Sequence, residues 1–307
     1  MTSIPRTVGW GIALATMTAI ISGVSVFANG LIVKEFADPV VLTGVRNAMV
    51  GAILLGILLA TGGRREIRGL SARPMAALLV IAVVGGSIPF ILFFSGLAEA
   101  TGPGAAFIHK TMFIWVAALA VPFLGESLGL AQIVAIGALL AGVVLVGPIG
   151  EVGLGSAEIL VLLATLMWAV EVVLVRALLA RTGVSVRLAA TARMVIGSLI
   201  IGGFLAVTGR LGGVAALTAW HWLMIAGTGV LLLGYVTTWY AALQRAPASL
   251  VASVLVGGAV ITAGLAVIRT GTVPAPAVEI GLMLLVVGVA MAIVAARGGT
   301  VRSARAG

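Results

Sequence analysis

The sequence predicts an all-α membrane protein whose ten transmembrane helices form two inverted five-helix repeats. Three observations predict this fold class: extreme apolarity, ten apolar stretches of helix length, and internal similarity at a fixed offset. Of the 307 residues, 62% are hydrophobic and 9% are charged, and the mean hydropathy is +1.28. Soluble domains carry about 25% charged residues. A soluble core could not hide so much apolar surface, whereas a lipid bilayer can.

Ten apolar stretches are long enough to cross a bilayer, which takes a helix of about 20 residues. We expect the spans at 8–32, 40–61, 75–98, 104–122, 128–147, 157–177, 187–208, 219–242, 248–268 and 276–296. The gaps are short, so no sizeable soluble domain is expected. The first stretch is too long for the core of a signal peptide and is interpreted as a retained span.

The chain has a net charge of +9, and its basic residues are distributed unevenly between the two sides of the predicted spans, which indicates the membrane topology. If the termini and alternate loops lie on one side, that side collects twelve basic residues: Arg6, Arg64, Arg65, Arg68, Arg73, Arg176, Arg181, Arg187, Arg245, Arg297, Arg302 and Arg305. The other side holds three, Lys34, Arg210 and Arg269, with acids that include Glu99 and Glu151. Cytoplasmic loops are rich in basic residues, so both termini should be cytoplasmic. We expect the lipid bilayer, and no nucleic acid, as a partner.

The chain repeats itself after about 146 residues. The segment VRNAMVGAILLGILLATG (45–62) matches ARMVIGSLIIGGFLAVTG (192–209), with Arg46 opposite Arg193. SGVS (22–25) aligns with WAVE (168–171), and EATGPGAA (99–106) with QRAPASLV (244–251), placing Pro103 opposite Pro247. The repeats are expected at 1–150 and 151–307. Five spans per repeat invert the second relative to the first, as in secondary transporters whose substrate site lies between the halves.

Several motifs resemble the EamA type of the drug/metabolite transporter superfamily over nearly the whole chain. PFLGESLGLAQIVAIGALLAGVVLV (122–146) resembles the end of that family's first repeat, with its Gly-Glu at Gly125-Glu126. WYAALQRAPASLVASVL (239–255) resembles the junction of spans eight and nine, and Trp168-Ala169 matches span six. Two departures are Ser22-Gly23, where the family usually has Trp-Gly, and RTGTV in place of a second Gly-Glu.

With His109-Lys110 and the aromatic residues, the chain looks most like the YddG-type bacterial amino-acid exporters. The resemblance implies a ten-helix carrier in the bacterial inner membrane that exports amino acids, especially aromatic ones. A monomer or homodimer is expected.

His109 and Lys110 are adjacent ionisable residues inside the apolar fourth span. Charged residues within a membrane are costly and usually face protein or water. Lys110 either contacts a substrate carboxylate or snorkels to the interface. Neighbouring helical residues point about 100° apart, so at least one of the two should face inward. His109 is either a structural histidine bonded to a backbone carbonyl, or a second donor or proton-linked switch.

Glu171 is the single acid well inside a span. It either binds a substrate ammonium or carries a proton, or it pairs with a buried arginine. Arg46 and Arg193 occur near span ends in both repeats, which favours an architectural role such as snorkelling or capping of helix carbonyls.

Aromatic residues provide candidate walls for a substrate cavity. Trp168 lies three residues before Glu171 and shares its helix face, as Tyr235 does with Trp239. Trp239 and Tyr240 could instead be membrane-belt anchors. Phe90, Phe93 and Phe94 near Pro89 could join the cavity or simply pack, and Ser22, opposite Trp168 in the repeat, would leave room.

Other function classes find little support. The chain has no cysteine and two histidines, His109 and His221, so we expect no disulfide, no metal site and no cofactor. It has no P-loop for ATP and no Gly-x-Ser-x-Gly turn, which disfavours an enzyme. A structural or sensor protein is also disfavoured because no extramembrane module is expected. The remaining rival is an exporter of organic cations or drugs, which would use Glu171 and the aromatic residues.

Overall fold

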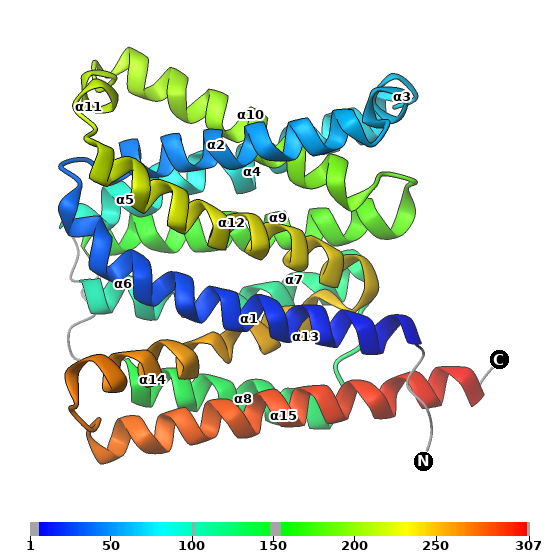
Figure 1. Ribbon diagram of the computed structural model, residues 1–307. Coiled ribbons are helices and arrows are strands. Elements are labelled where there is room, and N and C mark those ends of the chain that lie inside the picture. The colour runs from blue at the N-terminus through cyan, green and yellow to red at the C-terminus, as the bar shows by residue number, and fades with distance from the viewer. Residues whose placement is uncertain (1–5, 100–101, 148–154, 306–307) are drawn as a thin grey trace.

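The computed structural model describes residues 6–99, 102–147 and 155–305, without the side chains of 6, 98–99, 102–103 and 297–305. Within these ranges it contains helices and no strand (Figure 1). The first half contains α1 (Arg6–Ile32), η1 (Val33–Glu35), α2 (Pro39–Ala60), α3 (Gly63–Arg68), α4 (Ala72–Gly86), α5 (Ile88–Glu99), α6 (Gly102–Lys110), α7 (Met112–Leu124) and α8 (Leu130–Val146). The second contains α9 (Ser156–Arg181), α10 (Val186–Val207), α11 (Gly212–Ala215), α12 (Ala219–Arg245), α13 (Ala248–Val256), α14 (Gly258–Thr270) and α15 (Pro276–Arg305).

The prediction of ten spans in two five-helix repeats is confirmed. In the described part of the chain, nine segments are long and apolar enough to cross a membrane. The tenth is α8, whose 17 residues extend about 26 Å, at the short end of the spanning range. The expected repeat boundary at 150/151 lies outside the described residues, as do the side chains of Arg6, Glu99, Pro103, Glu151, Arg297, Arg302 and Arg305.

Three spans are interrupted, although the sequence predicts each as one helix. The third divides into α4 and α5, the fourth into α6 and α7, and the ninth into α13 and α14. In the fourth span the break is the single residue Thr111, whose hydroxyl donates to the Ile108 carbonyl at 2.7 Å, and in the ninth it is Gly257; both residues keep right-handed helical backbone angles. These breaks are 146 residues apart, the offset of the sequence repeat. Gly125 and Gly271, which end α7 and α14 with φ of 71° and 67°, keep the same offset.

The two repeats are interleaved. In Figure 1 both chain ends and α3 lie at one end of the bundle, here called the termini side, and α11 lies at the opposite side. The long helices pack mainly on helices of the other repeat: α2 on α10, α8 on α15, α7 on α9, α1 on α12, and α5 on α9. Residues of both repeats therefore meet in the interior.

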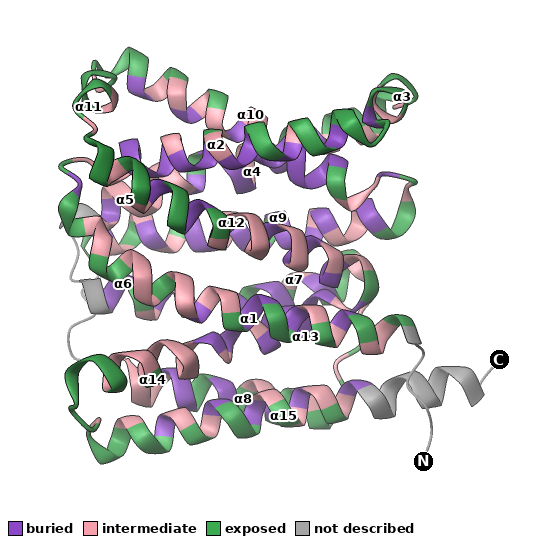
Figure 2. Ribbon diagram, viewed as in Figure 1, coloured by how far each residue is buried: buried purple, intermediate pink, exposed green. Residues whose placement is uncertain are grey.

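Close helix contact at α8 and α15 depends on glycine. A Cβ on Gly142 would lie 2.8 Å from the Gly281 carbonyl oxygen, and one on Gly281 would lie 2.9 Å from that of Gly142. Small residues of this kind allow helices to approach in a membrane, where lipid tails remove the hydrophobic drive between helices. Figure 2 shows buried residues concentrated where helices face one another, with exposed residues along the outer faces. The outer faces carry large apolar side chains such as Leu199, Val207 and Ile268, as lipid contact requires.

Candidate functional site

Four side chains from three spans meet in the interior and are here called the aromatic cluster: Phe90, Phe93, His109 and Trp168. The Trp168 ring lies 5.0 Å from the His109 ring, 5.2 Å from Phe90 and 5.6 Å from Phe93, between ring centroids. The contacts to Phe90 and His109 are edge-to-face, an arrangement that aromatic rings favour. The Trp168 indole also donates to the Gly85 carbonyl at 3.1 Å. Three predicted site residues, Phe90, His109 and Trp168, thus lie together.

The break between α4 and α5 directs two of these rings towards α9. Ser87 lies at the break, and its hydroxyl donates to the carbonyls of Ala82 and Val83 at 3.1 Å each. Phe90 and Phe93 follow at a three-residue spacing and therefore share one face of α5. The Phe94 ring contacts the Phe93 ring edge-to-face, with 5.4 Å between centroids.

A charged cluster of Glu171, Arg193 and Tyr240 adjoins the aromatic cluster. The Arg193 Nε lies 3.4 Å from Glu171 Oε1, and the Tyr240 hydroxyl donates to the same oxygen. All three side chains are buried. The guanidinium carbon of Arg193 lies 5.7 Å from the Phe90 ring centroid, which joins the two clusters. Of the two alternatives for Glu171, the structure shows the ion pair with a buried arginine.

Glycine makes room for this arrangement. A Cβ on Gly85 would collide with the Glu171 side chain. The same residue accepts the Trp168 hydrogen bond through its carbonyl. Gly85 therefore lets α4 pass close to α9 at the level of both clusters.

Lys110 and His109 end α6, next to the break in the fourth span. Lys110 is half-buried and has no hydrogen bond or ion pair in the described part of the chain. His109 packs on Trp168 and Phe93. Its Nδ1 is buried and has no hydrogen-bond partner among the described residues, so the expected bond to a backbone carbonyl is not found there.

The remaining predicted residues occupy other places. Tyr235 and Trp239 stack at 6.0 Å with an interplanar angle of 17°. Trp239 and Tyr240 are buried, so neither is a membrane-belt anchor. Ser22 is half-buried on α1, beside Gly23, whose carbonyl accepts a bond from Thr262 of α14 at 2.9 Å. No hydrogen bond joins Ser22 and Trp168, both of which lie in the described part of the chain.

Arg46 and Arg193 do not snorkel, because each is 6% exposed. The Arg46 Nη1 donates to Asn29 Oδ1 at 2.8 Å, while Arg193 belongs to the charged cluster. Arg193 and Tyr240 were not predicted as site residues from the sequence. The available signal was Glu171 itself, because a buried acid requires a counter-charge or a donor.

On the termini side, one set of contacts joins the two repeats and another joins two helices of the second repeat. Glu126, after α7, accepts hydrogen bonds from the Ala248 amide at 2.6 Å, the Ser249 amide at 3.1 Å and the Ser249 hydroxyl at 2.5 Å, all at the start of α13. Arg176 of α9 donates to the carbonyls of Leu243 and Gln244 at 2.9 Å each. These charge-assisted bonds are stronger than neutral ones.

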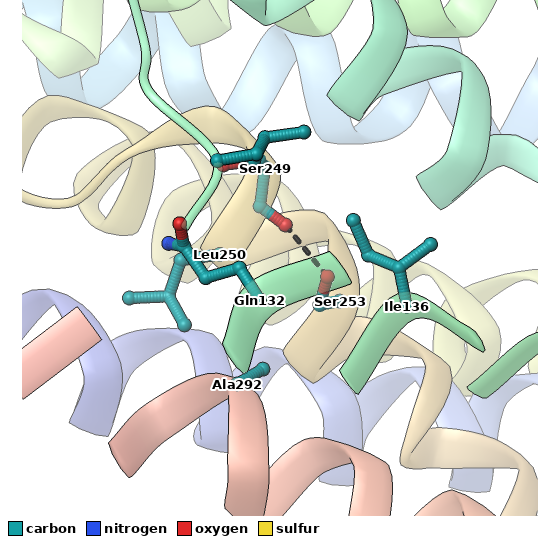
Figure 3. A pocket seen from close by; sticks show the side chains of 7 residues that line it. Gln132, Ile136, Ser249, Leu250, Ser253 and Ala292 are labelled. Carbon is teal, nitrogen blue, oxygen red and sulfur yellow. Dashed lines mark hydrogen bonds between the residues drawn. The ribbon is translucent and has the colours of Figure 1, made fainter. Parts of the chain in front are cut away.

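Two small pockets border these contacts. One, of about 120 Å³, lies between α7, α9 and the α12–α13 turn and is lined by Leu124, Glu126, Arg176, Ala177, Ala180, Arg181 and Pro247. The other lies between α8 and α13, where Ser253 bonds the Ser249 carbonyl beside Gln132 (Figure 3). Its volume of about 10 Å³ is no larger than one water requires. This second pocket is therefore too small for a substrate.

Comparison with known proteins decides the family. The sequence profile of the "EamA-like transporter family" matches the chain twice, over residues 9–147 and 155–294. The chain belongs to the EamA-like transporter family. The family resemblance of the sequence is thus confirmed, and so is the interpretation of the chain as a multi-pass membrane transporter.

Among solved structures, 29 chains are similar to this EamA-like transporter. One, described only as "Crystal structure of protein", aligns with a TM-score of 0.77 at 17% identity, covering 94% of this chain and 98% of its own. At that identity the likeness shows a shared fold and nothing more. A search of curated proteins found no match.

The interrupted helices indicate a candidate site in this EamA-like transporter. In carriers built from inverted repeats, broken helices at corresponding positions mark the substrate site. Here the break at Thr111 follows Lys110 directly, and His109 brings the aromatic cluster to the same level. Its counterpart is the break at Gly257. The candidate site is therefore the interior region between the breaks, bordered by the aromatic and charged clusters.

Proposed function

We propose that this EamA-like transporter is a secondary exporter of amino acids, especially aromatic and other apolar ones. The single observation that carries the proposal is the aromatic cluster lying against a buried ion pair, beside the broken fourth span. Aromatic rings offer stacking surface for an apolar or aromatic side chain, and nearby charges suit a zwitterion. The resemblance to YddG-type exporters supports the same substrate class.

Each end of an amino acid has a candidate partner. Lys110 has no bonding partner in the described part of the chain, and its ammonium is a compact donor for a carboxylate. Glu171 could receive the substrate ammonium by exchanging its contact with Arg193. Tyr235 and Trp239 extend the aromatic surface along α12.

In alternating access, one side of the interior opens while the other side closes. The contact of Glu126 with the start of α13, which joins the two repeats on the termini side, would hold that side together in one end state of such a cycle. In this proposal the protein lies in a bacterial inner membrane with cytoplasmic termini, as a monomer or homodimer. Transport runs on a substrate gradient or on proton exchange, and the protein is a carrier and not an enzyme.

Export of organic cations is the second candidate, favoured by Glu171 and the surrounding aromatic rings, since cations bind aromatic faces. The ion pair with Arg193 weakens it, because Glu171 is already neutralised. An unpaired Lys110 would repel a cation as well.

Efflux from proteoliposomes tests the proposal. Vesicles preloaded with labelled phenylalanine should lose it through the wild-type protein. Lys110→Ala should slow the loss about tenfold or more, because a hydrogen bond between charged groups contributes about 1.5–3 kcal/mol. Lys34→Ala, which alters the chain's other lysine on an exposed turn, is the matched control and should leave efflux unchanged.

Equal efflux in wild type and Lys110→Ala would remove Lys110 from the site. Movement of organic cations alone would favour the second candidate.

A further inference from the structure

A second polar cluster lies on α2, outside the site described above. Thr43, Arg46 and Asn47 share one helix face, since they are three and four residues apart. All three are buried, with exposed fractions of 1%, 6% and 1%. Thr43 Oγ1, Arg46 Nε and both polar atoms of the Asn47 amide have no hydrogen-bond partner among the described residues.

Such a concentration of unpaired polar atoms is unusual in a protein interior. Buried polar groups are nearly always hydrogen-bonded, and a buried charge without a partner costs most of all. The missing partner must be an acceptor, because the guanidinium of Arg46 can only donate. A carboxylate fits best, because guanidinium binds it through parallel hydrogen bonds.

The second repeat shows what Arg46 lacks. Its counterpart Arg193, 147 residues later, has the carboxylate of Glu171 at 3.4 Å. In the first repeat the residue aligned with Glu171 is Ser25. Asn29 donates to the Ser25 hydroxyl at 3.1 Å and accepts from Arg46 at 2.8 Å. A neutral serine–asparagine pair thus replaces the acid, and the positive charge of Arg46 has no counter-charge in the described part of the chain.

Arg46 and Lys110 lie at similar depths. Arg46 is seven residues from the start of α2 and Lys110 eight from the start of α6, or about 10 and about 12 Å from the opposite side. Both helices begin at that side. Two cations that have no acidic partner among the described residues, at one level, make this half of the interior electropositive, which attracts carboxylates.

We propose that Arg46, with Thr43, Asn47 and Asn29, is a second binding site for the carboxylate of the transported substrate. The site lies in the half of the protein towards the opposite side and would receive the carboxylate from the region of Lys110. This inference rests on the proposed function. It assigns a binding role to a residue whose duplication in the two repeats favoured an architectural one.

Binding to the purified full-length protein tests the site with three probes. L-phenylalanine has both charged groups, 3-phenylpropionate has only the carboxylate, and 2-phenylethylamine has only the ammonium. Arg46→Gln should weaken binding of the first two about tenfold or more, because a charge-assisted contact is lost. It should leave the affinity for 2-phenylethylamine within about twofold of the wild-type value, since the aromatic cluster is intact. Arg210→Gln, at the surface ion pair with Asp38, is the matched control and should change none of the three.

If the Arg46→Gln protein does not accumulate in the membrane, a second variant still tests the site. Asn47→Leu removes an unpaired buried amide, so it should fold at least as well as the wild type while weakening 3-phenylpropionate about threefold or more. Unchanged affinity for 3-phenylpropionate in the variants would overturn the carboxylate site while leaving the carrier proposal intact. Failure of the wild type to bind any of the three probes would overturn the proposed function itself, and this site with it.

Discussion

Replacing Glu171 with leucine should destabilise the transporter by about 3–5 kcal/mol, because the variant leaves Arg193 buried without a counter-charge. Both side chains are less than a tenth exposed, and the pair is 3.4 Å apart. The Tyr240 hydroxyl would lose its acceptor as well. The thermal unfolding temperature of the purified protein should fall by roughly 10 °C.

Two further variants separate the ion pair from general damage. Glu171→Leu combined with Arg193→Leu should recover most of the lost stability, because replacing a whole buried pair with apolar residues is often neutral. Glu279→Gln, at an exposed acid near the start of α15, should have no effect. A single variant as stable as the wild type would show that Arg193 does not depend on Glu171 for its charge balance.

Replacing Trp168 with alanine should cost about 3–5 kcal/mol of stability and abolish most phenylalanine efflux, because it leaves a large cavity in the interior. The indole contacts Phe90, Phe93 and His109 and bonds the Gly85 carbonyl. Unfolding temperature and proteoliposome efflux measure the two effects.

Trp168→Phe distinguishes stability from substrate contact. It keeps an aromatic ring but removes the bond to Gly85, so it should retain part of the efflux. Trp222→Ala is the matched control, because that indole is 46% exposed on an outer face, and it should change neither quantity. Normal efflux through Trp168→Ala would place the substrate elsewhere.

Much of the fold could be predicted because lipid imposes simple rules. Apolar length defines the spans, and a fixed offset between matching segments revealed the repeats. The helix breaks at Thr111 and Gly257 could not be predicted. Threonine and glycine also occur within continuous helices in membranes, and the break depends on tertiary packing.

The candidate site was predicted in part. Phe90 and Trp168, two of the aromatic residues expected as cavity walls, lie together, and His109, expected as a structural histidine or a second donor, packs against Trp168. Tyr240 was considered only as a possible belt anchor, because its distance from Glu171 in sequence hid the bond between them.

The two repeated arginines illustrate the limit of sequence similarity. Arg46 and Arg193 look equivalent in sequence, yet one contacts Asn29 and the other Glu171. The difference comes from partners on other helices, which the motif does not contain. Duplication therefore predicted a common position, and the charges around each arginine set its chemistry.

The structure also shows what the two residues of the Gly-Glu motif, Gly125 and Glu126, do. Gly125 ends α7 with a positive φ, and Glu126 bonds the first amides of α13. Gly271 keeps the backbone conformation in the second repeat, but Thr272 stands where an acid would follow. The carboxylate contact of the termini side thus lacks an acidic counterpart at that position of the second repeat.

Counterflow in proteoliposomes tests the central claim most directly. Vesicles loaded with unlabelled phenylalanine are diluted into a trace of labelled phenylalanine, and label inside is followed with time. An alternating-access carrier for aromatic amino acids predicts transient accumulation of label above its equilibrium level, lost in Trp168→Ala and kept in Trp222→Ala. Label that rises only to equilibrium, or does not enter while a labelled organic cation overshoots, would contradict the account.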